Sequence, residues 1–129
     1  MGNDLGKKYK LCSHVIIEDV FATGDLIKSY PFVARVKLTE LPKEVPFQLV
    51  FSAPKRTFRK AYQRNRIKRL CKEAFRLHKN ELETTLVKSN KQLALFLVFT
   101  SRDKISLNLL EKRVQKLIKK IITQLESHD

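Results

Sequence analysis

The sequence has no hydrophobic segment long enough to cross a membrane. Its longest apolar run is Leu93–Phe99, whereas a membrane-spanning helix needs about 20 apolar residues. The N-terminal residues also lack the apolar stretch of about 7–15 residues that a secretory signal peptide carries behind its charges. We therefore expect neither a transmembrane helix nor a signal peptide, and we expect a cytoplasmic protein.

Cysteine is scarce, and the two cysteines, Cys12 and Cys71, stand alone. Two cysteines form one disulfide at most, which is unlike the dense frameworks of small secreted domains. Neither has another Cys or a His at the spacing of a metal site, so we expect no metal site in the protein. Cys71 lies among apolar positions of an expected helix, which favours a small buried side chain over a reactive thiol.

Catalytic motifs are missing as well. With only three glycines, the chain has no Gly-rich phosphate loop, and it contains neither GxSxG nor HExxH. The histidines, His14, His78 and His128, are scattered, and no two carboxylates stand in a recognisable acid/base arrangement. His78 falls on the buried side of an expected helix, which favours a core or boundary histidine over a general base. We therefore expect no catalytic residue.

Acidic residues number 13 against 27 Lys and Arg, and this imbalance is local. The segment Lys55–Lys79 contains eleven Lys or Arg and one acid, Glu73, so it carries +10 of the chain's net charge of +14. A merely solvated helix face usually mixes both signs, because like charges at i,i+4 spacing destabilise a helix. So dense a cluster predicts a polyanionic partner.

Hydrophobic periodicity predicts a mixture of helices and strands. Alternation and short apolar runs indicate strands over residues 26–30, 32–38, 47–52 and 93–99. Apolar residues in steps of three and four indicate helices over residues 14–23, 60–79 and 107–125. This α-β-β-β-α-β-α order predicts an α+β fold, an α/β sandwich with helices packed on one small mixed sheet. The length predicts a single domain, 1–129, with a loose tail over about residues 1–8.

Capping residues define the expected ends of the helices. Ser13 and Ser106 are expected to cap the first and last helices. Gly24 is expected to end the first helix in a left-handed conformation. Asn80 is expected to cap the basic helix, with residues 81–92 following as a polar helical extension or a loop.

The helix expected over residues 60–79 has two unlike faces. At 100° per residue, its apolar face contains Ile67, Leu70, Cys71, Ala74 and His78. The opposite arc contains Asn65, Lys68, Arg69, Lys72, Arg76 and Lys79. Arginine offers a fork of donors that matches phosphate oxygens, and Asn65 adds a neutral donor and acceptor. The cationic face therefore predicts contact with a nucleic-acid backbone.

RNA is favoured over the other polyanions. A helix-turn-helix reader of DNA needs a partner helix and a short turn, whereas a strand and Pro54 precede this helix. A membrane-binding helix leaves large apolar side chains free, but here the neighbouring strands need them as cover. A single basic helix on a sheet suits an RNA stem-loop or junction. We expect neither a DNA nor a membrane partner.

The basic helix also carries a family resemblance. Residues 64–76, RNRIKRLCKEAFR, resemble the RNR signature of the bacterial ribonuclease P protein subunit, and residues 54–61, PKRTFRKA, resemble the segment leading into it. The similarity covers about residues 9–125. It implies a non-catalytic subunit of a ribonucleoprotein endoribonuclease, whose RNA holds Mg²⁺ and hydrolytically removes the 5′ leader of precursor tRNA. It also implies a left-handed strand–helix–strand crossover, where the general rule predicts a right-handed one.

Two surfaces follow from the resemblance and the helical pattern. The surface toward the catalytic RNA is expected to consist of Lys55, Arg56, Arg59, Lys60, Arg64, Asn65, Arg66, Lys68, Arg69, Lys72 and Arg76. The leader is expected in a cleft between the first helix and the sheet, lined by Ile17, Phe21, Phe32, Arg35 and Lys37. The implied partners are ribonuclease P catalytic RNA and precursor tRNA.

The sequence alone leaves two other functions open. A ribosomal or ribosome-assembly RNA-binding protein would need the same basic helix and would have no role in tRNA cleavage. A stand-alone nuclease is disfavoured by the missing acid/base set. Cleavage assays with and without a ribonuclease P RNA distinguish the three functions.

Overall fold

The computed structural model describes residues 7–101 and 105–127 and has the expected α+β fold. Its elements are the 3₁₀ helix η1 (Lys7–Tyr9), α1 (His14–Thr23), β1 (Asp25–Ser29), β2 (Phe32–Leu38), β3 (Phe47–Ser52), α2 (Ala61–His78), α3 (Asn80–Ser89), β4 (Leu93–Phe99) and α4 (Leu107–Ser127). Within the described residues, no helix combines the length and apolar character of a membrane span.

The strands form one mixed sheet in the order β1-β2-β4-β3. β2 pairs antiparallel with β1 and β4, whereas β3 pairs parallel with β4. β1 and β3 are therefore the edge strands. α2 and α3 form the connection between β3 and β4, and the hand of this crossover stays a prediction.

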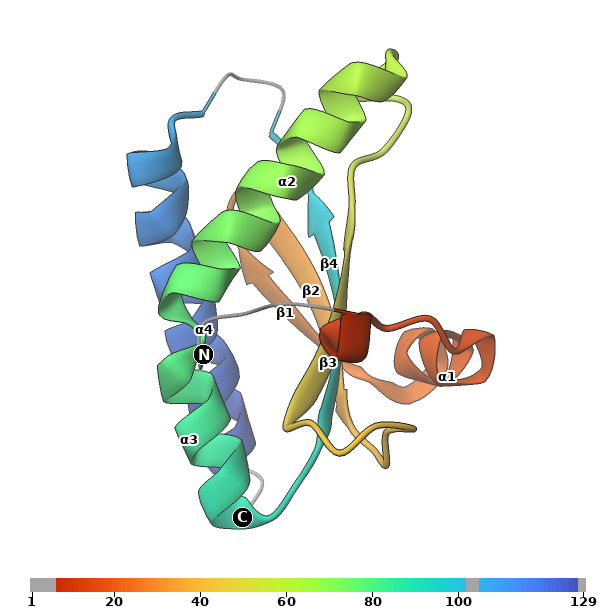
Figure 1. Ribbon diagram of the computed structural model, residues 1–129, viewed down its shortest axis with the longest axis vertical. Helices are drawn as coiled ribbons and strands as arrows, with labels where there is room; N and C mark the ends of the chain where they lie inside the picture. Colours follow the sequence, from red (N-terminus) through yellow and green to blue (C-terminus); the bar gives the residue numbers. More distant parts are fainter. Residues whose placement is uncertain (1–6, 102–104, 128–129) are drawn as a thin grey trace.

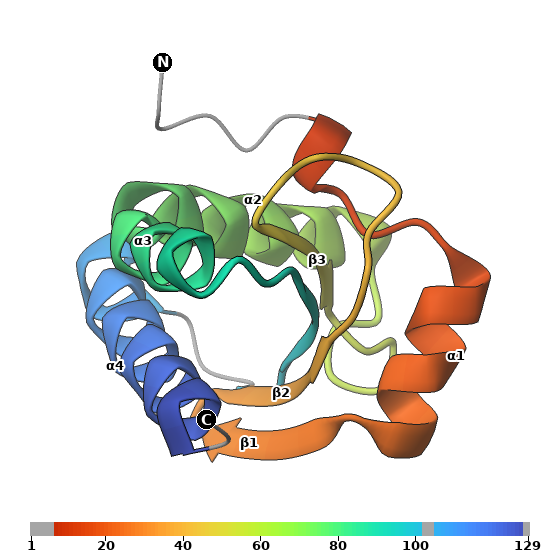
Figure 2. The same ribbon diagram turned by 90° about the horizontal axis from the view of Figure 1, so that it is seen from below.

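Helices cover the two faces of the sheet unequally. α2, α3 and α4 lie on one face, and α1 lies alone on the other (Figures 1 and 2). The three helices and the sheet enclose the main core, in which the largest fully buried apolar side chains include Phe32, Phe47, Phe75 and Phe99. Burying each such side chain contributes about 1.5–3 kcal/mol, so this layer holds the fold together.

A smaller apolar cluster joins α1 to its face of the sheet. Leu11, Val20 and Ala94 are buried there, and Ile17 and Phe96 pack against them. Side chains alternate along a strand, so residues next to those of the main core point to this face. The α1 face is therefore the more open of the two.

The close approach of α1 to the sheet requires a glycine at position 24. A Cβ there would lie 2.4 Å from the carbonyl oxygen of Val20 and 2.9 Å from that of Val36. The expected left-handed conformation of Gly24 is wrong, because its φ of −75° and ψ of 159° are extended. Its N–H nevertheless ends the helix by donating to Val20 O at 2.9 Å.

Other expected helix ends are partly confirmed. Ser13 Oγ accepts from the N–H of Ile16, and Ser106 Oγ accepts from the N–H of Leu109, each at 3.3 Å. The expected cap at Asn80 is wrong, because the chain stays helical at Lys79 and α3 begins at Asn80.

Of the helical extension or loop expected over residues 81–92, the helical alternative is confirmed, because α3 spans Asn80–Ser89. Asn90 caps the C-terminal end of α3 in a left-handed conformation, with a φ of 54° and a ψ of 45°. Of the expected tail, residues 1–6 lie outside the described residues, whereas Lys7 and Lys8 belong to η1, so the tail prediction is wrong there.

The two cysteines should differ in reactivity. Cys71 is fully buried in the main core, as predicted, and burial raises the pKa of its thiol to about 12. Cys12 is exposed. Since the thiolate is the nucleophile, iodoacetamide at neutral pH should alkylate Cys12 in the folded protein and Cys71 only after unfolding, as followed by mass spectrometry. Equal native-state rates at both positions would contradict this placement.

Candidate RNA interface

The α2 helix displays its cationic side chains on the outside of the three-helix layer. On its apolar face Cys71 and Ala74 are buried, as the sequence predicts, and Phe75 is buried beside them. The opposite side exposes Asn65, Arg66, Lys68, Arg69 and Lys72. Among the described residues, none of these four cations has a carboxylate partner. Their charge is therefore available to an external anion.

The loop before α2 extends this cationic surface. Lys55, Arg56, Arg59 and Lys60 are all exposed between β3 and α2. Phe58 anchors the loop, since its side chain is buried and its ring centroid lies 6.0 Å from that of Phe99. The loop therefore holds its charges next to the beginning of α2.

Arg64 has a structural role that sequence reasoning missed. One terminal nitrogen of its guanidinium donates to the carbonyl oxygens of Phe58 at 2.8 Å and Arg59 at 3.1 Å. Arg64 is half-buried and ties the basic loop to the first turn of α2. Replacing Arg64 would disturb the loop as well as any contact with RNA.

Two other cations near the end of α2 are engaged within the protein. Arg76 donates to Glu73 at 3.1 and 2.5 Å, and these hydrogen bonds lower the pKa of the Glu73 carboxyl. Lys79, which the helical wheel places on the cationic arc, is only 1% exposed. Its ammonium pairs with Glu83 and lies 5.2 Å from the centre of the Tyr9 ring. Lys79 therefore does not belong to the external surface.

His78 occupies the boundary between α2 and α4. Its Nε2 lies 2.9 Å from Glu111 Oε1, and its Nδ1 lies 3.1 Å from the side-chain amide of Gln115. The interpretation as a boundary histidine is confirmed, because both ring nitrogens have partners from α4.

The α1 face of the sheet carries a second group of expected site residues. Phe21 is 45% exposed and meets Phe96 edge to face, with ring centroids 4.6 Å apart. Arg35 is paired with Phe96 across β2 and β4, and its guanidinium lies 5.5 Å from the centre of the Phe21 ring. Ile17 is half-buried beside them. Aromatic and guanidinium planes thus lie together on one open surface, which suits unpaired bases.

Lys37 lies on the same face but is engaged by α1. Its ammonium donates to Asp19 Oδ2 at 2.5 Å and to Thr23 Oγ1 at 2.6 Å. The hydrogen bond from Lys37 lowers the pKa of the Asp19 carboxyl, although burial opposes this effect. Lys37 thus joins β2 to α1, and a phosphate would have to compete with Asp19 for it.

The expectation that Phe32 lines a cleft between α1 and the sheet is wrong. Phe32 is 1% exposed, and its ring packs at 5.7 Å from Phe99 and 6.4 Å from Phe51 in the main core. Because strand side chains alternate, Phe32 faces α2 and α4, whereas Arg35 faces α1. Phe96 is the aromatic residue of β4 on the α1 face, and sequence reasoning missed it because the apolar run of β4 shows no alternation.

No metal centre forms in the described part of the chain. Residues 7–101 and 105–127 contain no group of three or more His, Cys, Asp or Glu side chains that could hold an ion.

Comparisons with known proteins agree with this architecture. A family model described as Ribonuclease P matches residues 5–122. The Ribonuclease P protein component of Porphyromonas gingivalis is 28% identical over 117 residues, which cover 91% of this chain and 85% of that protein.

Solved structures show the same fold at low identity. The RNase P protein of Staphylococcus aureus has a TM-score of 0.66 at 17% identity, covering 86% of this chain and 93% of that chain. The RNase P protein from Thermotoga maritima has a TM-score of 0.65 at 17% identity, covering 86% of this chain and 96% of that chain. With a family model matching most of its length, the chain belongs to the Ribonuclease P family.

Proposed function

We propose that the protein binds the catalytic RNA of ribonuclease P and assists removal of the 5′ leader from precursor tRNA in the cytoplasm. The observation that carries this proposal is the row of exposed cations on α2, in a chain of this family: Arg66, Lys68, Arg69 and Lys72 have no carboxylate partner within residues 7–101 and 105–127. Cations three to four residues apart recur at about one-turn spacing, which suits the phosphates of a folded RNA. The proposal disfavours a ribosomal role, because the family match covers most of the chain.

In this proposal the protein positions RNA and the RNA performs hydrolysis. The charge of α2 and its loop repels divalent cations, so Mg²⁺ is placed on the RNA subunit. Neutralising phosphates with lysine and arginine also lets RNA segments approach one another at lower Mg²⁺ concentration. The expected contribution of the protein is therefore greatest when Mg²⁺ is scarce.

The α1 face is proposed to hold the single-stranded leader. Phe21 and Phe96 offer ring surface, and Arg35 offers a guanidinium beside them. Unpaired bases stack on such groups with little dependence on sequence. This surface lies across the sheet from α2 (Figure 2), so one protein can contact both RNAs at once.

Replacing Phe21 by Ala should weaken binding of leader-bearing precursor tRNA to the reconstituted enzyme by about tenfold, since base–aromatic stacking contributes about 1–3 kcal/mol. Mature tRNA, which has no leader, should bind as before. Fluorescence anisotropy with both RNAs measures this difference. Val15→Ala is the matched control, because Val15 is an exposed apolar residue of the same helix. An equal loss for both RNAs would reject the leader assignment.

Three parallel reactions test the proposed function. Precursor tRNA is incubated at low Mg²⁺ with the protein alone, with a bacterial ribonuclease P RNA alone, and with both. The proposal expects rapid cleavage at the mature 5′ end only in the third reaction. Cleavage by the protein alone would instead establish a stand-alone nuclease, and no gain from adding the protein would favour an RNA-binding role elsewhere.

A further inference from the structure

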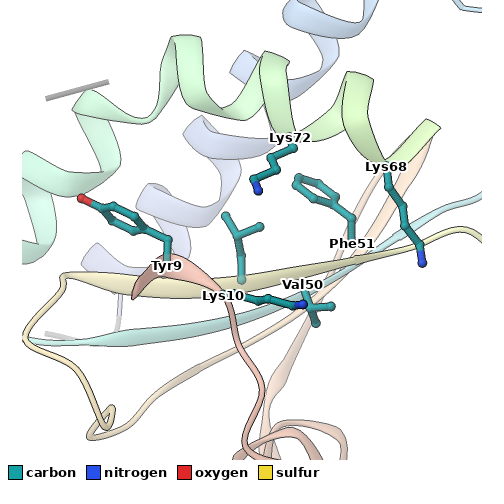
Figure 3. Close-up of a pocket in the computed structure, with 7 residues that line it drawn as sticks. Tyr9, Lys10, Val50, Phe51, Lys68 and Lys72 are labelled. Atoms are coloured by element: carbon teal, nitrogen blue, oxygen red, sulfur yellow. The ribbon is translucent and has the colours of Figure 1, made fainter. Parts of the chain in front are cut away.

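The edge of β3 that faces away from β4 borders a pocket to which the proposed function gives no role. Among the described strands, β3 pairs with β4 alone, and the N-terminal segment covers part of its other edge. The N–H of Leu11 donates to Leu49 O there at 3.0 Å. Beside this contact lies a pocket of about 270 Å³, between the N-terminal segment and α2 (Figure 3). Its apolar lining comes from Leu49, Val50 and Phe51 of β3.

The backbone of β3 adds hydrogen-bonding groups to the pocket. The carbonyl of Leu49 points away from β4, because it accepts from Leu11. In a strand paired parallel on one side, residues two apart turn their N–H and C=O groups the same way. Phe51 therefore presents a donor and an acceptor at the edge that the pocket borders.

Three lysines surround this apolar lining. Lys68 and Lys72 come from α2, and Lys10 comes from the N-terminal segment on the other side (Figure 3). All three are exposed, and none has a carboxylate partner among the described residues. Lys68 and Lys72 are four residues apart on a helix, where like charges repel. A bound anion would offset this repulsion.

Tyr9 forms one wall of the pocket, and contacts within the fold hold its side chain in place. The hydroxyl of Tyr9 donates to Glu83 Oε1 at 3.4 Å, and its ring packs at 5.2 Å from that of Phe47. The ammonium of Lys79 lies 5.2 Å from the same ring. Lys10 follows directly, so the segment that carries it is held against α3 and β3 before any ligand arrives. Such preorganisation lowers the cost of binding.

The size and chemistry of the pocket select one class of ligand. Drug-sized ligands occupy pockets of about 300–1,000 Å³, so this pocket has room for a single ring system and not for several stacked bases. Lysines satisfy a phosphate, apolar side chains cover a base, and the strand edge can hydrogen-bond the rim of that base. An inorganic anion would use only the first of these features.

We propose that the pocket binds one unstacked nucleotide of the catalytic RNA, with its phosphate among Lys10, Lys68 and Lys72 and its base on the apolar lining of β3. The inference rests on the proposed function and deepens it. The catalytic RNA is the source because Lys68 and Lys72 belong to the cationic face of α2. None of Phe21, Arg35 and Phe96, which form the surface proposed for the leader, lines the pocket.

Nucleotide binding by the free protein is the first test. Adenosine 5′-monophosphate should shift the backbone amide NMR signals of Lys10, Val50 and Phe51 saturably. Inorganic phosphate and adenosine should each bind about tenfold more weakly, since each lacks half of the contacts. Equal binding of phosphate would show a simple anion site and overturn the proposal, as would the absence of shifts at β3.

Matched charge reversals provide the second test. Lys10→Glu should weaken nucleotide binding by about tenfold, because a lysine contact to phosphate becomes a repulsion. Lys7→Glu is the control, since Lys7 lies exposed on the same segment and does not line the pocket. It should change the affinity by less than about twofold. Equal effects of the two variants would overturn the proposal.

The same variants locate the nucleotide in the full complex. With catalytic RNA, Lys10→Glu should lower the log–log salt slope of binding by about 0.7–0.9 relative to Lys7→Glu, as expected for one lost phosphate contact. If wild-type protein binds this RNA but the two variants bind alike, the pocket assignment fails and the proposed function stands. If wild-type protein does not bind it, the proposed function itself fails. A Lys10→Glu effect limited to leader-bearing precursor tRNA would overturn the assignment to the catalytic RNA.

Discussion

Replacing both Arg66 and Arg69 by Ala should weaken binding to ribonuclease P RNA by about 10²–10⁴-fold at low salt, since hydrogen bonds to charged groups each contribute about 1.5–3 kcal/mol and two such contacts are lost. The log–log salt slope should fall by about 1.5, because two phosphate contacts and their released counterions are lost. Both side chains are exposed on α2 and have no carboxylate partner among the described residues. Filter binding over a salt series measures both quantities.

The control for this experiment removes the same charge from another helix. Lys112 and Lys116 are exposed on α4, so Lys112→Ala with Lys116→Ala leaves the net charge equal to that of the α2 double variant. If affinity depended on net charge alone, the two double variants would lose it equally. An unchanged salt slope in the α2 variant would mean that Arg66 and Arg69 do not meet phosphate.

Replacing Phe32 by Ala should lower the free energy of unfolding by about 3–5 kcal/mol, the usual cost of truncating a buried phenylalanine. Phe32 is 1% exposed and packs against Phe51 and Phe99. Urea unfolding followed by circular dichroism measures this loss. Any folded fraction should still distinguish precursor from mature tRNA, because Phe32 faces away from α1.

The stability and leader binding of Phe32→Ala should be compared with those of Phe21→Ala. Phe21 is half-exposed, so its truncation should cost less stability than that of Phe32 and should affect leader binding more. If Phe32→Ala kept full stability but lost selectivity for the leader, the division of the sheet into a core face and an α1 face would be wrong.

Local periodicity is sufficient to predict most elements of this fold. The alternation in β2 and the steps of three and four in α2 and α4 are enforced by burial on one face, so they are visible in the sequence. The division of α2 into an apolar and a cationic face is confirmed for the same reason. The sequence also predicts the mixed sheet and the element order.

Long-range contacts explain what the sequence could not predict. The N-terminal segment pairs with Leu49 across a large separation in the chain, so no local pattern indicates that Lys10 lies at the edge of β3. The burial of Lys79 depends on Glu83 and on Tyr9, which is distant in sequence. A helical wheel places Lys79 with the exposed cations because it contains no information about such partners.

The error at Phe32 has a different origin. Alternation along β2 already separates Phe32 from Arg35 by face, but the proposed cleft combined residues of both faces. Which of the two faces lies next to α1, and so can hold the leader, depends on where α1 packs. α1 packs on the side of Phe96, and the sequence of β4 is apolar on both sides.

The Mg²⁺ dependence of precursor cleavage tests the central claim most directly. Catalytic RNA at a fixed concentration is titrated with Mg²⁺, without protein, with wild-type protein, and with the Arg66→Ala, Arg69→Ala double variant. Phosphate neutralisation by α2 predicts that wild-type protein shifts the midpoint to lower Mg²⁺ and that the double variant largely loses this shift. If the wild-type protein left the midpoint and the cleavage rate unchanged, this chain would not be the protein subunit that assists the ribozyme.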